Sequence, residues 1–102
     1  MYFYDEGLFL MRRGMAELEL GDGRRAADYL ERGLSTLPDH YRRDRAWYGA
    51  CLARAQAIQG DAEAAVAVAL GVAPDATVLN AYAVTELRRT AHDLASGGAP
   101  GV

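Results

Sequence analysis

The sequence has few residues of the kinds that build β-sheets. Its 102 residues include one isoleucine, Ile58, together with few valines and threonines. No segment alternates apolar and polar residues over the length of a strand. Alanine supplies about a fifth of the chain and favours helices that approach one another closely. The composition therefore predicts an all-α protein with one small core.

The chain also lacks the features of a secreted or membrane protein. Cys51 is the single cysteine, which excludes an intrachain disulfide and fits a reducing compartment. The opening residues 1–6 carry acids and no basic segment, unlike a signal peptide. The longest apolar run, 62–73, contains Glu63 and is too short to span a bilayer. We therefore expect a cytoplasmic protein with no membrane partner.

Lysine is absent, so all eleven basic residues are arginines, and the net charge is −3. A nucleic-acid-binding domain usually has a clear basic excess, so this balance argues against one. The arginine pairs are interleaved with acids, and helical spacing predicts the ion pairs Asp28–Arg32 and Glu86–Arg89. Glu17 and Glu19 are two residues apart and therefore lie on different faces of a helix, so they do not form a catalytic pair of carboxylates. Glu17 is instead four residues from Arg13, which is the spacing of a helical ion pair. Direct nucleic-acid binding by the arginine-rich helices remains the alternative.

No residue pattern for catalysis, metal binding or cofactor binding is found. His40 and His92 have no metal-ligand partner at helical spacing, and Cys51 has no histidine nearby in the sequence. The two Gly-Asp segments, at 21–22 and 60–61, follow expected helices rather than strands and lack the lysine of a phosphate-binding loop. We therefore predict a protein that is not an enzyme, with no metal and no cofactor, in which Cys51 is a small core residue.

One segment of the sequence recurs with a period in the high thirties. Gly21-Asp22-Gly23-Arg24-Arg25-Ala26-Ala27 returns as Gly60-Asp61-Ala62-Glu63-Ala64-Ala65. Each copy lies between two helical stretches, and each second helix runs out at a proline, Pro38 or Pro74. A helix, a tight turn, a helix and a proline at this period are typical of a helical-hairpin repeat array.

The apolar periodicity predicts five antiparallel helices. Their expected ranges are about Tyr4–Leu20, Arg24–Thr36, Tyr41–Gln59, a short Asp61–Leu70, and Ala76–Leu94. The domain is expected to span 1–94, followed by a flexible tail at 95–102 that is rich in glycine, serine and proline. Gly21 is the expected C-terminal cap of the first helix, and Asp22 the N-cap of the second.

The third and fifth expected helices have different apolar patterns. The third carries two stripes, a bulky one (Tyr48, Cys51, Leu52, Ala55, Ile58) and a smooth one (Ala46, Gly49, Ala50, Ala53, Ala57). A helix with two packing faces is expected between neighbours. The fifth carries one apolar stripe (Val84, Leu87, Ala91, Leu94) and a charged outer side (Glu86, Arg88, Arg89, Asp93), which suits a C-terminal capping helix.

These repeats resemble the tetratricopeptide repeat (TPR). Gly21, Ala26, Leu30, Gly33 and Pro38 fall at the spacing that this family uses for its turn glycine, packing residues and closing proline. The second copy keeps Gly60, Ala65 and Ala69, whereas Pro74 comes early. In the first helix two frames stay open, one with Gly14 as the small residue and one in which Leu8, Met11 and Met15 pack. The resemblance implies about two and a half TPR-like repeats closed by a capping helix.

A narrower resemblance covers most of the chain. The segments 43–48, 59–61 and 86–89 look like the C-terminal half of certain actinobacterial transcriptional regulators. In these regulators a helix-turn-helix domain precedes degenerate tetratricopeptide repeats. The resemblance implies the sensor or oligomerisation part of such a regulator, or a freestanding relative.

The candidate partner-binding residues are Phe9, Arg13, Trp47, Arg54 and Asn80. Trp47 and Arg54 are one heptad apart on the third helix with Ala50 between them, which would give an aromatic wall, a small floor and a cation. Such a set suits a peptide carboxylate, because arginine binds carboxylates bidentately. Phe9 with Arg13 offers a similar pair, and Asn80 could hydrogen-bond an extended backbone. The alternative, that Trp47 packs against a neighbouring helix, stays open.

We therefore predict a non-enzymatic module for protein or peptide interaction or for oligomerisation. Because short repeat arrays are stabilised by their neighbours, self-association through the first or last helix is also expected. The alternatives are a nucleic-acid-binding helical domain and an accessory subunit of an enzyme.

Overall fold

The computed structural model describes residues 2–96, and it describes side chains from residue 6 to residue 95. These residues form five α-helices and no strand: α1 (Tyr2–Glu19), α2 (Gly23–Thr36), α3 (Arg42–Ile58), α4 (Ala62–Leu79) and α5 (Ala81–Ser96). The predicted all-α class and the number of helices are confirmed. Helix α5 continues two residues into the predicted tail, and residues 97–102 lie outside the described part of the chain.

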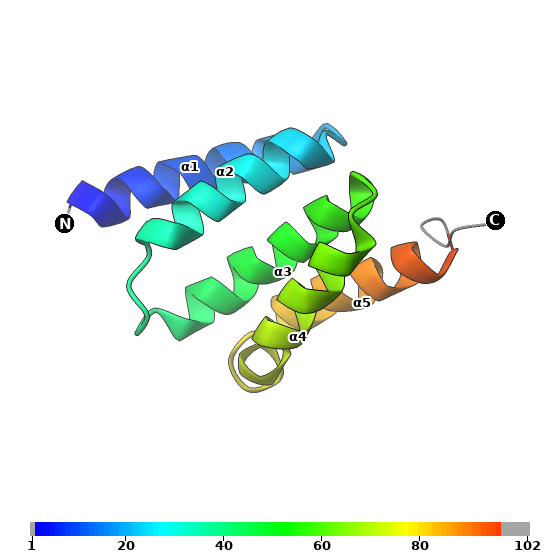
Figure 1. The fold of residues 1–102 in the computed structure, drawn as a ribbon. Coiled ribbons are helices and arrows are strands. Elements are labelled where there is room, and N and C mark those ends of the chain that lie inside the picture. Colours follow the sequence, from blue (N-terminus) through cyan, green and yellow to red (C-terminus); the bar gives the residue numbers. More distant parts are fainter. Residues whose placement is uncertain (1, 97–102) are drawn as a thin grey trace.

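Helix α3 lies at the centre of the molecule, as its two packing faces predict. It contacts α2, α4 and α5 extensively and α1 only slightly, whereas α1 packs almost entirely on α2. Figure 1 shows α1 and α2 side by side at one end, with α4 and α5 beyond α3. The molecule is elongated, with extents of 47 × 28 × 19 Å.

The core consists of two clusters that meet along α3. The larger one joins α1, α2 and α3 through Met11, Leu18, Leu30 and Leu37, and it includes Cys51, which is fully buried as predicted. The smaller one joins α3 to α4 and α5 through alanines (Ala46, Ala50, Ala76, Ala83). Trp47 contacts both clusters. The alanine side chains let α3, α4 and α5 approach closely.

The two repeated Gly-Asp turns have the same conformation. Gly21 and Gly60 have φ values of 84° and 94°, which favour glycine because it has no Cβ. In each turn two backbone N–H groups bond back to carbonyls of the preceding helix, as in a Schellman cap. The following aspartate then accepts a hydrogen bond from the N–H three residues on, at 3.1 Å for Asp22–Arg25 and 3.2 Å for Asp61–Ala64. The predicted caps are confirmed.

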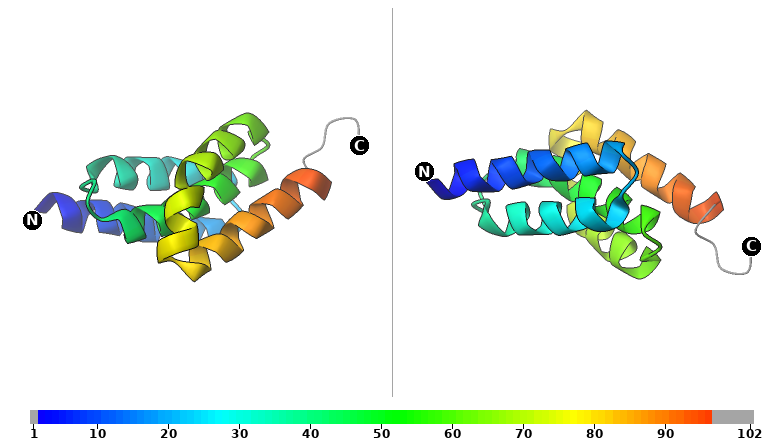
Figure 2. Two further views of the ribbon diagram at one scale, coloured as in Figure 1. Left: turned by 90° about the horizontal axis from the view of Figure 1, so that it is seen from below. Right: turned by 90° about the horizontal axis from the view of Figure 1, so that it is seen from above.

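Helix α4 is longer than predicted, and the expected break at Pro74 is wrong. The helix runs through Pro74 to Leu79, and the chain leaves it at Asn80 instead. A proline inside a helix costs about 3 kcal/mol because it cannot donate to the carbonyl four residues back. Residues beyond it offset this cost: Ala76 is buried, Asp75 pairs with Arg42, and the Thr77 hydroxyl donates to the Ala73 carbonyl at 2.9 Å. Figure 2 shows the helix changing direction in this part, drawn in yellow.

The greater length of α4 also bears on whether this helix could span a membrane. With 18 residues and a mean hydropathy of 1.5, it is long and apolar enough to cross a membrane by length and composition alone. The shorter run considered from the sequence, 62–73, does not reach that length. Only 11% of this helix is buried in the structure.

The buried face of α5 also differs from the predicted stripe. Ala83, Glu86 and Thr90 are buried, whereas Ala91 is exposed. Glu86 was expected on the outer, charged side, but the close packing of α5 on α3 turns it inward. Its predicted partner Arg89 does reach it, with 3.4 Å between Nη1 and Oε2.

Among the other expected ion pairs, one forms and one does not. Asp28 and Arg32 are paired at 3.4 Å on the exposed face of α2. Glu17 pairs with Arg25 across the first turn, at 3.7 Å, rather than with Arg13. Arg13 instead lies over the ring of Tyr29 and donates to its hydroxyl at 3.2 Å. The antiparallel packing of α2 on α1 supplies these nearer partners.

Candidate functional site

Two hollows flank α3 because the helices on either side of it do not meet. Among the described residues, the backbones of α1 and α5 do not approach each other closely, and neither do those of α2 and α4. The first hollow, here called the α1/α3/α5 groove, has a volume of about 560 Å³ and is lined by Met15, Leu18, Glu19, Trp47, Arg54, Glu86 and Arg89. It is thus built from the first helix of each hairpin and from the closing helix.

The lining of this groove includes an ion-paired cluster of one acid and two arginines. Arg54 on α3 and Arg89 on α5 approach different oxygens of Glu86, with Nη1–Oε1 at 3.3 Å and Nη1–Oε2 at 3.4 Å. The Glu86 side chain is only 10% exposed, whereas that of Arg89 is 59% exposed. A carboxylate this deeply buried needs a charged partner, because its desolvation is costly. Two cations on one anion give this cluster a net positive charge, which Glu19 balances in the groove lining as a whole.

Arg54 has a hydrogen-bonding capacity that the described residues do not use. Its Nε is shielded from solvent and has no acceptor among them. The side chain as a whole is 28% exposed, so part of it is accessible to solvent. Arg54 and Arg89 also line a smaller hollow of about 310 Å³ with Thr85, Arg88, His92 and Asp93.

Cys51 lies next to this cluster but is not available for chemistry. Burial, with a smaller contribution from the charge of Glu86, raises the pKa of its thiol to about 12, and Arg54 opposes the shift. A thiol with this pKa is protonated at neutral pH and is therefore a poor nucleophile. The cysteine acts as a packing residue beneath the groove.

Two of the five predicted partner-binding residues come together in this groove. Trp47 and Arg54 both line it. Trp47 is partly buried against the two core clusters and lies edge-on to Tyr82, with ring centroids 6.5 Å apart. The packing of Trp47 against neighbouring helices is therefore confirmed. The side chain also lines the groove, and its role in binding a partner stays a prediction.

The other three predicted residues lie elsewhere. Phe9 is 62% exposed on α1 and does not line the groove. Arg13 is turned towards Tyr29 on α2. The Asn80 side chain caps α5 by accepting from the Ala83 N–H at 3.1 Å. Its position between α4 and α5 explains this role, because the first turn of a helix lacks internal acceptors.

Five groove residues were not predicted from the sequence, namely Met15, Leu18, Glu19, Glu86 and Arg89. Met15 and Leu18 were identified only as members of the apolar stripe of the first helix. The burial of Glu86 could have been predicted from its spacing, because it is three residues after Ala83 and four before Thr90 and therefore shares a helical face with them. Its second cation, Arg54, is 32 residues away in the sequence, and no local pattern connects the two.

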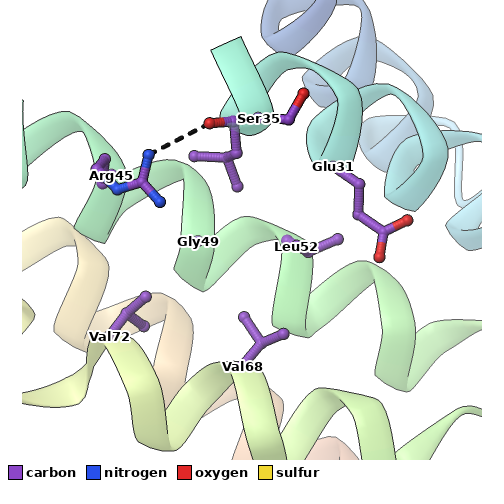
Figure 3. Close-up of a pocket in the computed structure, with 8 residues that line it drawn as sticks. Glu31, Ser35, Arg45, Gly49, Leu52, Val68 and Val72 are labelled. Carbon is purple, nitrogen blue, oxygen red and sulfur yellow. Dashed lines mark hydrogen bonds between the residues drawn. The ribbon is translucent and has the colours of Figure 1, made fainter. Parts of the chain in front are cut away.

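The second hollow lies between α2, α3 and α4 and is mostly apolar. Its volume is about 390 Å³, and Leu34, Leu52, Val68 and Val72 supply its walls. Figure 3 shows Val68 and Val72 on α4 facing Gly49 and Leu52 on α3. Arg45 closes one end by donating to the Leu34 and Leu37 carbonyls at 3.2 and 3.0 Å. These bonds satisfy carbonyls at the end of α2, so Arg45 has a structural role.

Residues that could hold a metal ion do not gather in the described part of the chain. No group of three His, Cys, Asp or Glu side chains lies close enough together there. Most of the arginines are engaged by the protein itself: seven of the eleven have an acceptor or ion-pair partner among the described residues (Arg13, Arg25, Arg32, Arg42, Arg45, Arg54, Arg89).

Comparisons with known proteins give no relative to this chain. No family model matches the sequence, and no curated protein or solved structure matches the chain.

Proposed function

We propose that this chain is a non-enzymatic TPR-like interaction module that binds an acidic peptide segment in the α1/α3/α5 groove. The observation that carries the proposal is the groove itself: three alternate helices line it, and Arg54 and Arg89 are among the lining residues. Repeat arrays of helical hairpins commonly use such concave faces for docking.

The arrangement of the helices supports a TPR-like array. Two hairpins are joined by turns of the same conformation, each consecutive pair of helices packs together, and α3 contacts both neighbours. Two features depart from a regular array: α1 contacts α3 only slightly, and α4 continues past Pro74. The slight contact of α1 with α3 widens the groove between α1 and α5.

The chemistry of the groove favours a partner with a carboxylate. Arg54 and Arg89 share the single carboxylate of Glu86, so both retain N–H donors for a second acceptor. Guanidinium groups bind carboxylates through two parallel hydrogen bonds, which gives both strength and direction. Met15, Leu18 and Trp47 offer apolar surface beside them for a neighbouring side chain.

The biological setting follows from the sequence resemblance. A module of this kind would be the sensor or assembly part of a cytoplasmic bacterial transcriptional regulator, or a freestanding relative. Binding of a protein segment in the groove would then be coupled to a DNA-binding domain. Its partner is a protein or peptide rather than nucleic acid, because the chain has a net charge of −3 and nucleic-acid-binding domains usually have a basic excess.

The test is a binding assay with short fluorescent peptides that carry an apolar residue beside a free C-terminal carboxylate. The same peptides with an amidated C-terminus serve as the reference. Arg89→Gln removes one guanidinium from the groove and leaves Arg54 to pair with Glu86. We expect it to weaken binding about tenfold, equivalent to about 1.4 kcal/mol.

The matched control is Arg32→Gln. Arg32 has the same side-chain exposure as Arg89, 58% against 59%, and the same 3.4 Å distance to its acidic partner, but it lies on α2 outside the groove. Equal losses of peptide affinity in Arg89→Gln and Arg32→Gln, or equal binding of the free and amidated peptides, would refute peptide binding in this groove. Tight and steeply salt-dependent binding of DNA or RNA would support the nucleic-acid alternative instead.

A further inference from the structure

Helix α4 presents an exposed apolar face. Val66, Leu70 and Val78 are 44%, 70% and 77% exposed, and Ala67, Gly71 and Pro74 on the same side are exposed as well. Between Glu63 and Asp75 the helix has no charged residue. An apolar face of this kind on a soluble protein marks a contact surface.

The glycines identify the centre of that surface. Five other glycines in the helices each stand where a second helix or its side chain approaches so closely that a Cβ would collide with it. The nearest atoms belong to Thr36 for Gly7, Leu30 for Gly14, Ala55 for Gly23, Met11 for Gly33 and Val72 for Gly49. Gly71 differs, because no described atom lies within 4 Å of its added Cβ.

Gly71 therefore makes no close contact with another described helix of its own chain. Glycine destabilises the interior of a helix relative to alanine, and at the other five positions close packing offsets this effect. At Gly71 no described contact provides such an offset. Gly71 lies beside Ala67 and Leu70 on the exposed apolar face. Because glycine has no side chain, the backbone of another helix can approach closely at this position.

We propose that the occupant is a second copy of this chain, whose α4 packs antiparallel on α4 with Gly71 near the two-fold axis. In a symmetric dimer the same patch serves both partners, so an uncharged face is complementary to itself. The groove and this face share no residue, so the proposal does not depend on the function proposed for the groove.

The charges around α4 favour a second copy over a membrane surface. The described part of α4 has no basic residue, and Asp61 and Glu63 stand at its N-terminal end. Helices that lie on anionic lipid surfaces have arginines or lysines beside the apolar face. Arg42 lies at the other end, paired with Asp75. An antiparallel arrangement separates the two Glu63 carboxylates and brings each towards the end of the partner that carries Arg42.

The contact is expected to be reversible. A helix of 18 residues is about 27 Å long, so two such helices bury less than the roughly 1,600 Å² of a standard interface. The dimer should therefore dissociate on dilution. This differs from the self-association expected from the sequence, which was assigned to the first or last helix.

The first experiment measures the mass of the purified chain by sedimentation equilibrium over a wide range of concentration. We expect a monomer–dimer equilibrium that Leu70→Glu shifts to monomer, with dissociation at least about tenfold more favourable. Leu20→Glu is the matched control, because Leu20 is 79% exposed at the α1–α2 turn and should leave the equilibrium unchanged. Circular dichroism checks that both variants stay helical.

The second experiment fixes the geometry by disulfide formation. Cys51 is fully buried, so an added cysteine is the one accessible thiol in the native chain. Leu70→Cys, one residue from the proposed axis on the same exposed face, should form a disulfide-linked dimer quickly under mild oxidation. Glu63→Cys should not, because eight residues from the axis place the two copies about 24 Å apart, beyond the reach of a disulfide.

Three results would overturn the proposal. They are a wild-type chain that stays monomeric at high concentration, equal effects of Leu70→Glu and Leu20→Glu, and Leu70→Cys cross-linking no faster than Glu63→Cys. Flotation of the wild-type chain with uncharged phosphatidylcholine vesicles, abolished by Leu70→Glu, would assign the face to a lipid surface instead. Loss of peptide binding in Arg89→Gln leaves the dimer unaffected, so the two proposals fail separately.

Discussion

Glu86 shows how one side chain organises the candidate site. It is buried on α5, yet it remains paired with two arginines, one of them from α3. Removing either partner would leave part of a buried charge uncompensated, which is far more costly than losing a surface ion pair. The cluster therefore fixes how α5 lies against α3 and at the same time places both guanidinium groups in the groove.

Cys51 offers a measurable signature at this scale. Burial and the charge of Glu86 raise the pKa of its thiol from 9.0 to about 12 in the folded chain. Above pH 9 the unfolded chain loses the thiol proton while the folded chain keeps it. Ionisation then favours the unfolded state, so the stability contributed by Cys51 is complete below pH 9 and falls as the pH rises towards 12.

The prediction is tested by urea unfolding between pH 8 and pH 11 on the wild type and on Cys51→Ala. We expect the free energy of unfolding of the wild type to fall by about 1 kcal/mol per pH unit more than that of the variant above pH 9. All other ionisable groups are the same in both proteins, so the difference isolates the thiol. Parallel pH profiles would show that the native thiol ionises normally.

At the scale of the helices, the two repeated turns determine where the hairpins reverse. Gly21 and Gly60 share the left-handed backbone, and Asp22 and Asp61 share the cap. These features depend on neighbouring residues only, and so the sequence predicted them correctly. The end of α4 did not follow from local residues, because contacts of Ala76 and Asp75 with α3 and α5 outweigh the cost of Pro74.

Substitution of the turn glycines tests whether the two turns are energetically equivalent. Neither glycine has an atom within 4 Å of an added Cβ, so an alanine would meet only backbone strain. We expect Gly21→Ala and Gly60→Ala each to lower the free energy of unfolding by about 1 kcal/mol. Thermal or urea unfolding measures this, and a loss confined to one turn would show that the two copies are not equivalent.

At the scale of the whole molecule, stability is unevenly distributed. Helix α3 packs against α2, α4 and α5, whereas α1 depends on α2. Figure 2 shows α1 and α2 forming one end of the elongated molecule. A helix with one main neighbour can open without disrupting the rest of the fold.

Native-state hydrogen exchange measures this difference directly. We expect the amides of α3 to exchange most slowly, through global unfolding, and those of α1 to exchange through a local opening of lower free energy. The experiment is best done at low protein concentration, where association through α4 is small. Equal opening free energies for α1 and α3 would show that the two ends unfold together.

The sequence by itself determined the helical class, the repeated caps, the central position of α3 and the burial of Cys51. All of these depend on periodicity or on residues that are close along the chain. The tertiary structure alone decided the pairing of Arg54 with Glu86, the course of α4 beyond Pro74, and the exposure of Gly71. These depend on how helices separated by a turn pack together, and the free energy of that packing overrides local preferences at Pro74 and Glu86.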